Sequence, residues 1–503
     1  MKRAPGKLPP KRSAVIDWSD DAPEDAIPSQ DPKAASVEAD ADTTEDDMDD
    51  VTFVSRPRPE RLAPRRVARK FYAIARPDIT PGPEFVRVLD ALESSNENLF
   101  VTGKAGTGKS TLLQYFRATT AKNVAVLAPT GVAALNVGGQ TIHSFFKFGT
   151  EVTLEKVKRL ARSERALYEK LDAIVIDEVS MVRADLFDCV EKFLRLNGRS
   201  EGEPWGGVQI IAFGDLFQLP PVVPPDERHI FEDHYAGPFF FNAFAFDELD
   251  LSLVELATVY RQSDAEFIAF LDRVRRGEID ADAIARFNAA AVRELEEKDA
   301  SAIVLVPTNA QADTINATAL RTITGAERVY RGAVEGAFSE RDFPTAIALA
   351  LRVGAQVMLL KNDPEGRYVN GDLAVVEKLS PSSVRVRFPD GTHEEIVPSR
   401  WEKVRHGFDP SEGAVRTEIV GAFTQLPLRL SWAVTIHKGQ GKTFDRVRID
   451  LGRGAFAPGQ IYVALSRCRS MEGIALTAPM RERDVIVDAR VREFLARAKR
   501  LPA

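Results

Sequence analysis

The stretch NLFVTGKAGTGKSTLL at residues 98–113 decides the fold of this 503-residue chain. An apolar run at 98–102 leads into glycines at 103, 106 and 108, and Lys109 and Ser110 follow directly. Glycines let a backbone wrap closely, so that its N–H groups face phosphate oxygens, and a helix that begins at about Lys109 brings its positive end to the same anion. A strand before the glycines and a helix after them predict a phosphate-binding loop rather than a chance glycine-rich turn.

A pair of carboxylates follows a second apolar strand. The run AIVI at 173–176 ends in Asp177 and Glu178. We expect Asp177 to hold Mg²⁺ together with Ser110, Glu178 to polarise an attacking water, and Lys109 to reach the β- and γ-phosphates. An acidic pair that merely caps a strand is the alternative, and the loop upstream argues against it. The two motifs together predict hydrolysis of a nucleoside triphosphate.

Short apolar runs alternate with helical segments from about residue 81, which is typical of a parallel α/β sheet. Residues 351–400 differ, because short strands there are separated by NG and DG turns and predict a small β-barrel. Basic residues at 156–170 predict a solvated helix. The runs expected as buried strands are 98–102, 123–128, 173–177, 208–213, 302–307 and 446–450.

The N-terminal segment is polar. Residues 1–55 hold 14 Asp or Glu against 6 Lys or Arg, which leaves +1 for the rest of a chain whose net charge is -7. Such a composition predicts disorder. The basic stretch at 56–70 is read as a solvated linker in preference to a DNA- or partner-binding arm. A secretory signal, a membrane span and a disulfide framework are not expected, since Cys189 and Cys468 are the only cysteines, and a reducing cytoplasm fits best.

Further motifs follow in a fixed order. They are APTGVAA (128–134), TIHSFF (141–146), VIDEVSMV (175–182), FGDLFQLPPV (213–222), VYRQ (259–262), VPTNAQADTIN (306–316), GAQVMLLKN (354–362), YVNGD (368–372), SWAVTIHKGQGKTFD (431–445) and GQIYVALSRCRS (459–470). In this order they resemble the motifs of superfamily 1B DNA helicases of the Pif-like branch, with its RecD-like relatives, in the bacterial type. The resemblance covers roughly residues 85–480.

The resemblance implies an α/β fold of two RecA-like P-loop NTPase lobes, each a parallel sheet flanked by helices. It also implies a small inserted wedge subdomain and an SH3-like β-barrel insertion. The expected boundaries are a disordered tail over 1–80, a first lobe over 81–255 that contains the wedge at 143–170, a second lobe over 256–351 and 426–503, and the barrel over 352–425.

Roles of single residues also follow from the resemblance. Gln218 is expected to contact the γ-phosphate and Asp215 to support the Mg²⁺ and water shell. Arg261 and Arg467 are expected as arginine fingers, and a buried salt bridge is the alternative for Arg467. The residues expected to bind the nucleotide are Gly103, Ala105, Gly106, Thr107, Gly108, Lys109, Ser110, Thr111, Gln218, Arg261, Gly441 and Arg467. The residues expected to contact DNA are Thr130, His143, Phe145, Thr435, His437 and Lys438, although Phe145, with Phe146 and Phe148, could equally pack the inserted wedge.

The chain departs from the family pattern at three places. It has no glutamine upstream of the phosphate loop to read adenine, which leaves selectivity for ATP over GTP open. Gly439 stands where the family has a serine. Ala374 takes the place of a second glycine in the barrel motif.

These features together predict an ATP- and Mg²⁺-dependent DNA helicase that moves along single-stranded DNA, 5′→3′ by resemblance. Expected roles are repair, recombination, or genome and telomere maintenance. The expected partners are single-stranded and forked DNA, with repair or replication proteins, and the enzyme is expected as a cytoplasmic, nucleoid-associated monomer without a membrane. Two alternatives stay open: a RecD-like subunit of a larger nuclease complex, and an ATP-dependent DNA-binding scaffold that does not unwind.

Overall fold

The structure is a computed structural model that describes residues 76–149, 152–293, 302–363, 365–409 and 414–501. The predicted N-terminal tail lies outside these ranges up to residue 75, so its disorder stays a prediction. Within the described residues, no helix combines the length and the apolar character needed to cross a membrane.

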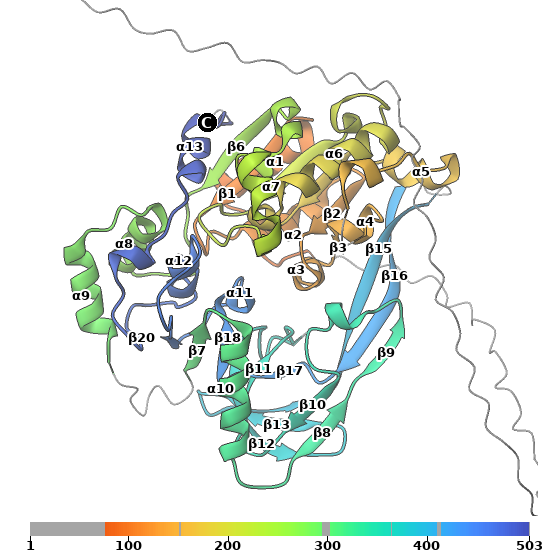
Figure 1. Cartoon of the computed structure of the whole chain (residues 1–503). Coiled ribbons are helices and arrows are strands. Elements are labelled where there is room, and N and C mark those ends of the chain that lie inside the picture. The colour runs from red at the N-terminus through yellow and green to blue at the C-terminus, as the bar shows by residue number, and fades with distance from the viewer. Residues whose placement is uncertain (1–75, 150–151, 294–301, 364, 410–413, 502–503) are drawn as a thin grey trace, which may run out of the picture. The chain divides into compact units, whose positions relative to one another are not determined.

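Six strands form the sheet of the first lobe (Figure 1), and all neighbours in it are parallel. The strands predicted between residues 98 and 213 are confirmed as β1, β2, β4 and β5. Across the sheet the order is β3 (Gln140–Thr141), β2 (Val124–Ala128), β4 (Ala173–Ile176), β5 (Gln209–Phe213), β1 (Asn98–Gly103) and β6 (Leu251–Leu256).

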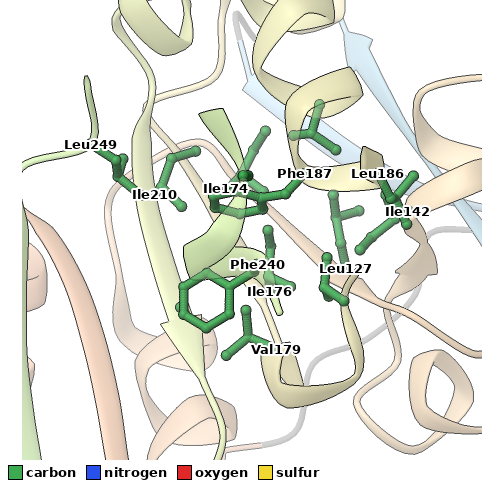
Figure 2. Close-up of a cluster of buried hydrophobic side chains, with 14 of the residues drawn as sticks. Leu127, Ile142, Ile174, Ile176, Val179, Leu186, Phe187, Ile210, Phe240 and Leu249 are labelled. Atoms are coloured by element: carbon green, nitrogen blue, oxygen red, sulfur yellow. The ribbon is translucent and has the colours of Figure 1, made fainter. Parts of the chain in front are cut away.

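Apolar side chains cover both faces of this sheet, because successive residues of a strand point to opposite sides. On β1, Leu99 and Val101 belong to one buried cluster and Phe100 to another. Figure 2 shows part of the second cluster, where Ile174 and Ile210 pack with Phe187 and Phe240. The helices of the lobe are α1 (Pro83–Ser94), α2 (Lys109–Thr119), α3 (Gly131–Asn136), α4 (Ile142–Phe145), α5 (Arg162–Glu169), α6 (Ala184–Asn197) and α7 (Arg228–Asp233).

A second parallel sheet forms the core of the second lobe. Its order is β18 (Ala433–Thr435), β7 (Ile303–Val306), β19 (Val447–Ile449) and β20 (Ile474–Leu476). The strands predicted at 302–307 and 446–450 are confirmed as β7 and β19. The helices of this lobe are α8 (Ala265–Arg276), α9 (Ala281–Ala291), α10 (Asn309–Thr322), α11 (Ile436–Gly439) and α12 (Gln460–Leu465).

The C-terminal helix α13 (Ala489–Arg497) packs on the first lobe. Phe494 stacks on Phe241 with ring centroids 4.4 Å apart, and the backbone N–H of Leu253 in β6 donates to the carbonyl of Lys499 at 2.7 Å. The prediction that 426–503 belongs wholly to the second lobe is therefore wrong for the last helix. Val491 of this helix belongs to the buried cluster of the first lobe, Phe494 and Leu495 pack against that cluster, and a pattern within the helix does not reveal this placement.

Antiparallel strands lie between β7 and β18 along the chain. The strands are β8 (Arg328–Arg331) with β10 (Ala348–Leu351); β14 (His393–Ile396), β13 (Val384–Arg387), β12 (Leu373–Leu379), β11 (Gln356–Leu359) and β17 (Leu428–Leu430) in that order; and β15 (Ser399–Asp409), β16 (Ala414–Gln425) and β9 (Ala333–Gly336). Two strands outside the predicted barrel range of 352–425 pair with strands inside it: β9 pairs with β16, and β17 pairs with β11. Closure of these strands into an SH3-like barrel stays a prediction.

The two long strands β15 and β16 form a ribbon that reaches the first lobe beside α4 and α5 (Figure 1). His406 of β15 is buried there. Its backbone N–H donates to Gln140 Oε1 at 3.0 Å, its Nε2 lies 3.3 Å from the carbonyl oxygen of Val126, and its ring packs edge-on against Phe145. The antiparallel region is thus attached to the first lobe as well as to the second.

The segment predicted as a wedge is anchored by aromatic packing. Phe145, Phe146 and Tyr168 are buried and pack against one another, and Phe146 and Tyr168 also pack against Phe193 of α6. The solvated helix predicted over 156–170 is shorter than expected, because α5 begins only at Arg162. The wedge function itself stays a prediction.

His406 predicts a pH dependence of stability. Burial, followed by the nearby Arg117, lowers the pKa of His406 to about 4. The unfolded chain, with an ordinary histidine pKa of about 6.5, therefore binds more protons as pH falls, so stability is full above that value and declines below it. We expect His406 to account for a loss of about 2 kcal/mol in the free energy of unfolding between pH 7 and pH 5.

Urea denaturation at the two pH values measures this loss. The His406→Asn variant should lose about 2 kcal/mol less than the wild type over the same interval. The matched control is His393→Asn, because the side chain of His393 is 41% exposed. That control should keep the wild-type slope, and an equal slope in the His406 variant would contradict the prediction.

Candidate functional site

The phosphate loop leaves β1 at Gly103 and enters α2 at Lys109. Gly106 and Gly108 take φ values of 85° and 80°, a region that side chains disfavour. A Cβ added at Gly106 would lie 2.5 Å from Cβ of Arg261. Gly106 is therefore required both by the backbone turn and by the close approach of Arg261, a residue from beyond β6.

Lys109 lies against this loop. Its Nζ donates to the carbonyl oxygens of Gly103, at 2.7 Å, and Lys104, at 3.0 Å. Burial lowers the pKa of Lys109, although Asp215 and Glu178 raise it in part. The ammonium is thus held at the loop in a place where its charge is only partly compensated.

A cavity of about 440 Å³ opens above the loop. Twelve of the lining residues are among those predicted to serve the nucleotide or its hydrolysis, and they come from both lobes. Gly103 and Asp177, also predicted, are not in the lining. The lining consists of Ala105, Gly106, Thr107, Gly108, Lys109, Ser110, Thr111, Glu178, Gln218, Tyr260, Arg261, Gly441, Thr443, Arg467 and Arg469.

The two carboxylates lie at the end of β4, as predicted. Burial, followed by the adjacent Glu178, raises the pKa of Asp177 to about 7, and burial also raises that of Glu178. Glu178 takes a left-handed backbone conformation, with φ 50° and ψ 44°. Carboxylates whose charged form is disfavoured by burial, together with the hydroxyl oxygen of Ser110, fit a divalent cation held through a nucleotide. Among the described residues, no three His, Cys, Asp or Glu side chains form a metal cluster.

Two arginines approach the cavity from beyond the first lobe's sheet. Arg467, just after α12, donates to the carbonyls of Val463 and Lys442 and to the Ser466 hydroxyl, which are all neutral acceptors. Burial, followed by the neighbouring Arg261, lowers the pKa of Arg467 to about 9. These bonds do not support the alternative of a buried salt bridge for Arg467. A cation buried among neutral acceptors and facing a cavity is a ready site for an anion.

A further amide connects two residues of the cavity lining. Gln440, the residue after α11, donates through Nε2 to Gln218 Oε1 at 3.0 Å and to Glu178 Oε2 at 3.2 Å. Gln440 was not singled out in the sequence, although it lies within the TIHKGQG motif. Tyr260, Thr443 and Arg469 of the lining were likewise not predicted.

Asp215 is not among the residues that line the cavity, and its expected place in the metal and water shell stays a prediction. Its carboxylate is fully buried and forms an ion pair with Arg275 of α8, with Oδ1 3.0 Å from Nη2. The hydroxyl of Tyr462 also donates to it, at 3.3 Å. Arg275 and Tyr462 were missed because their partner is distant in the sequence.

The predicted DNA contacts fall at equivalent places in the two lobes. The segments Thr141–Ser144 and Thr435–Lys438 each follow the edge strand of a parallel sheet, and each threonine caps a helix by accepting from the N–H three residues on. His143 and His437 are half-buried, and burial lowers the pKa of each. Thr130 caps α3 in the same way. Thr141 was not predicted, although the repeated T-I-H tripeptide could have indicated it.

Phe145 differs from the other predicted contacts. Its ring is 3% exposed, because it packs against Phe146, Tyr168 and His406. The packing alternative describes this side chain, and base stacking is not available to it in this arrangement. Lys438, in contrast, is exposed.

Comparison with known proteins matches residues 85–283 to the PIF1-like helicase model. The ATP-dependent DNA helicase Pif1 of Bdellovibrio bacteriovorus is 34% identical over 430 residues, which cover 83% of this chain and 92% of that protein. Pif1 from Bacteroides sp, solved in complex with ADP-AlF4, matches with a TM-score of 0.77 at 36% identity over 84% of this chain and 100% of that one. The same enzyme bound to ssDNA matches with a TM-score of 0.61 at 36% identity, again over 84% and 100%. The chain therefore belongs to the family of PIF1-like helicases, ATP-dependent enzymes that act on DNA.

Proposed function

We propose that this helicase moves along single-stranded DNA in the 5′→3′ direction and unwinds the duplex at a fork. The observation that carries the proposal is the single cavity in which a phosphate loop, a carboxylate and a second-lobe arginine converge. Supporting it, the Bacteroides relative has been solved bound to ssDNA and at forked dsDNA. The alternative of an ATP-dependent scaffold shares this cavity and differs from the proposal only in that it does not separate strands.

The proposed roles of the nucleotide-site residues follow from their places around the cavity. The loop amides and Lys109 would bind the phosphates, and Ser110 with Asp177 would hold Mg²⁺, which would supply positive charge to the transferred phosphoryl group. Glu178 accepts a proton from the attacking water, helped by a pKa that burial has raised. The remaining groups contact the γ-phosphate or close over it: Gln218, Arg261, Gly441 and Arg467.

The DNA strand is proposed to cross the two T-I-H segments, one in each lobe. Thr130, His143, Thr435, His437 and Lys438 are its proposed contacts, and Phe145 is left out because it is buried. Since the segments sit on different lobes, any change in lobe separation changes the spacing between the two contacts. Closure on ATP and opening after hydrolysis would then advance the strand.

The biological setting is proposed from the family. The enzyme would act as a monomer on chromosomal DNA in the cytoplasm, in repair, recombination or genome maintenance. A RecD-like subunit of a nuclease complex is the second candidate. No observation on the described residues favours it.

Unwinding of a labelled fork tests the function directly. With ATP and Mg²⁺, the enzyme should separate a duplex that carries a single-stranded 5′ tail and leave one with only a 3′ tail intact. Lys109→Ala should separate neither, because the phosphates lose their point charge while the core is unchanged. Wild-type ATP hydrolysis without strand separation on any tailed substrate would leave the scaffold alternative instead.

Two variants test how the lobes communicate. Glu178→Gln should block hydrolysis but keep ATP binding, because an amide keeps the shape and cannot act as a base. Arg467→Ala should lower the rate by about 10³, the effect of losing an arginine finger. A non-hydrolysable ATP analogue should shift DNA affinity in the first variant and not in the second. The same shift of DNA affinity in both variants would show that Arg467 does not couple the two lobes.

A further inference from the structure

A buried polar network lies behind the phosphate loop, outside the lining of the nucleotide cavity. It joins Asp215, which follows β5 in the first lobe, to Arg275 of α8 and Tyr462 of α12 in the second. The three side chains are 0%, 2% and 2% exposed. Buried polar groups of this kind hold a fixed geometry, because each is costly to leave unpaired.

Tyr462 connects this network to the loop itself. The backbone N–H of Ala105, in the phosphate loop, donates to the Tyr462 hydroxyl at 2.8 Å. The same hydroxyl donates to Asp215 Oδ2 at 3.3 Å. Burial alone would raise the pKa of Asp215, but Arg275 and Lys109 more than offset this and leave it below its usual range. The carboxylate is thus an acceptor only, so the hydroxyl proton points to Asp215 and a lone pair stays free for Ala105.

The network continues into the cavity. Gln218 Nε2 lies 3.5 Å from Asp215 Oδ2, Gln218 Oε1 accepts from Gln440, and Gln440 also donates to Glu178. One series of polar contacts therefore runs from the loop backbone, through both lobes, to the carboxylate proposed as the base. Tyr462 is the side chain of the second lobe that touches the loop in this series.

Tyr462 and Arg467 are carried by one short element. Arg467 follows α12 by two residues, and its Nε donates to the carbonyl of Val463, the residue after Tyr462. The depth to which α12 seats on the loop therefore also sets how far Arg467 reaches into the cavity. Removing the Tyr462 hydroxyl would leave α12 in place but would break its hydrogen bond with the backbone N–H of Ala105.

We infer that the Tyr462 hydroxyl is a positioning group that seats α12 on the phosphate loop and thereby couples the nucleotide to the DNA-bearing second lobe. It acts through Arg467 and Gln218 and does not contact the nucleotide. The inference rests on the nucleotide site proposed above.

Tyr462→Phe removes the hydroxyl and leaves no cavity. Its kcat for DNA-stimulated ATP hydrolysis should fall about tenfold, the effect of one hydrogen bond, while the KM for ATP stays within about twofold because the cavity lining is unchanged. DNA affinity should also lose its response to a non-hydrolysable ATP analogue. A merely structural role would lower the melting temperature and leave both the kcat and that response as in the wild type, which would overturn the inference.

Tyr235→Phe is the matched control. Tyr235 is 6% exposed and its hydroxyl is bonded to Asp188, another buried aspartate, in a part of the first lobe away from the cavity. This variant should match the wild type in kcat, KM and nucleotide response. If the wild type itself shows no DNA-stimulated hydrolysis, the proposed function fails. If the wild type does and Tyr462→Phe equals it, only the coupling role of Tyr462 is overturned.

Discussion

Parallel pairing of the strands is the constraint on which the rest of this structure depends. In a parallel sheet every strand ends at the same edge, so residues far apart in the chain are brought together there. The phosphate loop follows β1, the carboxylate pair follows β4, and Asp215 follows β5. The second sheet repeats the arrangement, with Thr435 at the end of β18. These residues, which are predicted to serve the nucleotide or DNA, lie at these edges because each of them follows the end of a parallel strand.

The charges at this edge are not balanced by the protein alone. Burial lowers the pKa of Lys109, Arg261 and Arg467, and it raises the pKa of Asp177 and Glu178. Each of these groups is therefore held where its charged form is disfavoured. A nucleotide with its metal ion brings negative charge to the cations and positive charge to the carboxylates. Binding should consequently stabilise the folded enzyme as well as prepare it for hydrolysis.

Local patterns in the sequence predicted the parts of the site that are themselves local. The phosphate loop, the strand before Asp177 and the helix from Lys109 could be predicted because each lies within a few residues of its own signal. The RecA-like fold and the finger role of Arg467 came instead from resemblance to a family, and the role itself stays a prediction.

The missed features depend on pairing across long stretches of chain. Asp215 lies 60 residues from Arg275, and Ala105 lies 357 residues from Tyr462. The role of Phe145 could not be predicted for a similar reason. The local sequence around an aromatic residue on a short helix is the same whether its ring packs in a core or stacks on a base. Only the position of α5 and β15 around it decides between the two.

The return of the C-terminal helix has a mechanical consequence. The chain passes from the first lobe to the second once after β6 and passes back once before α13, and the returning segment pairs beside β6 through Leu253 and Arg500. Arg492 of α13 also donates to the carbonyl of Arg276 at the end of α8. The two crossings join the lobes at neighbouring points, and the ribbon of β15 and β16 adds a third attachment beside α5. Any relative motion of the lobes must therefore be accommodated at all three places.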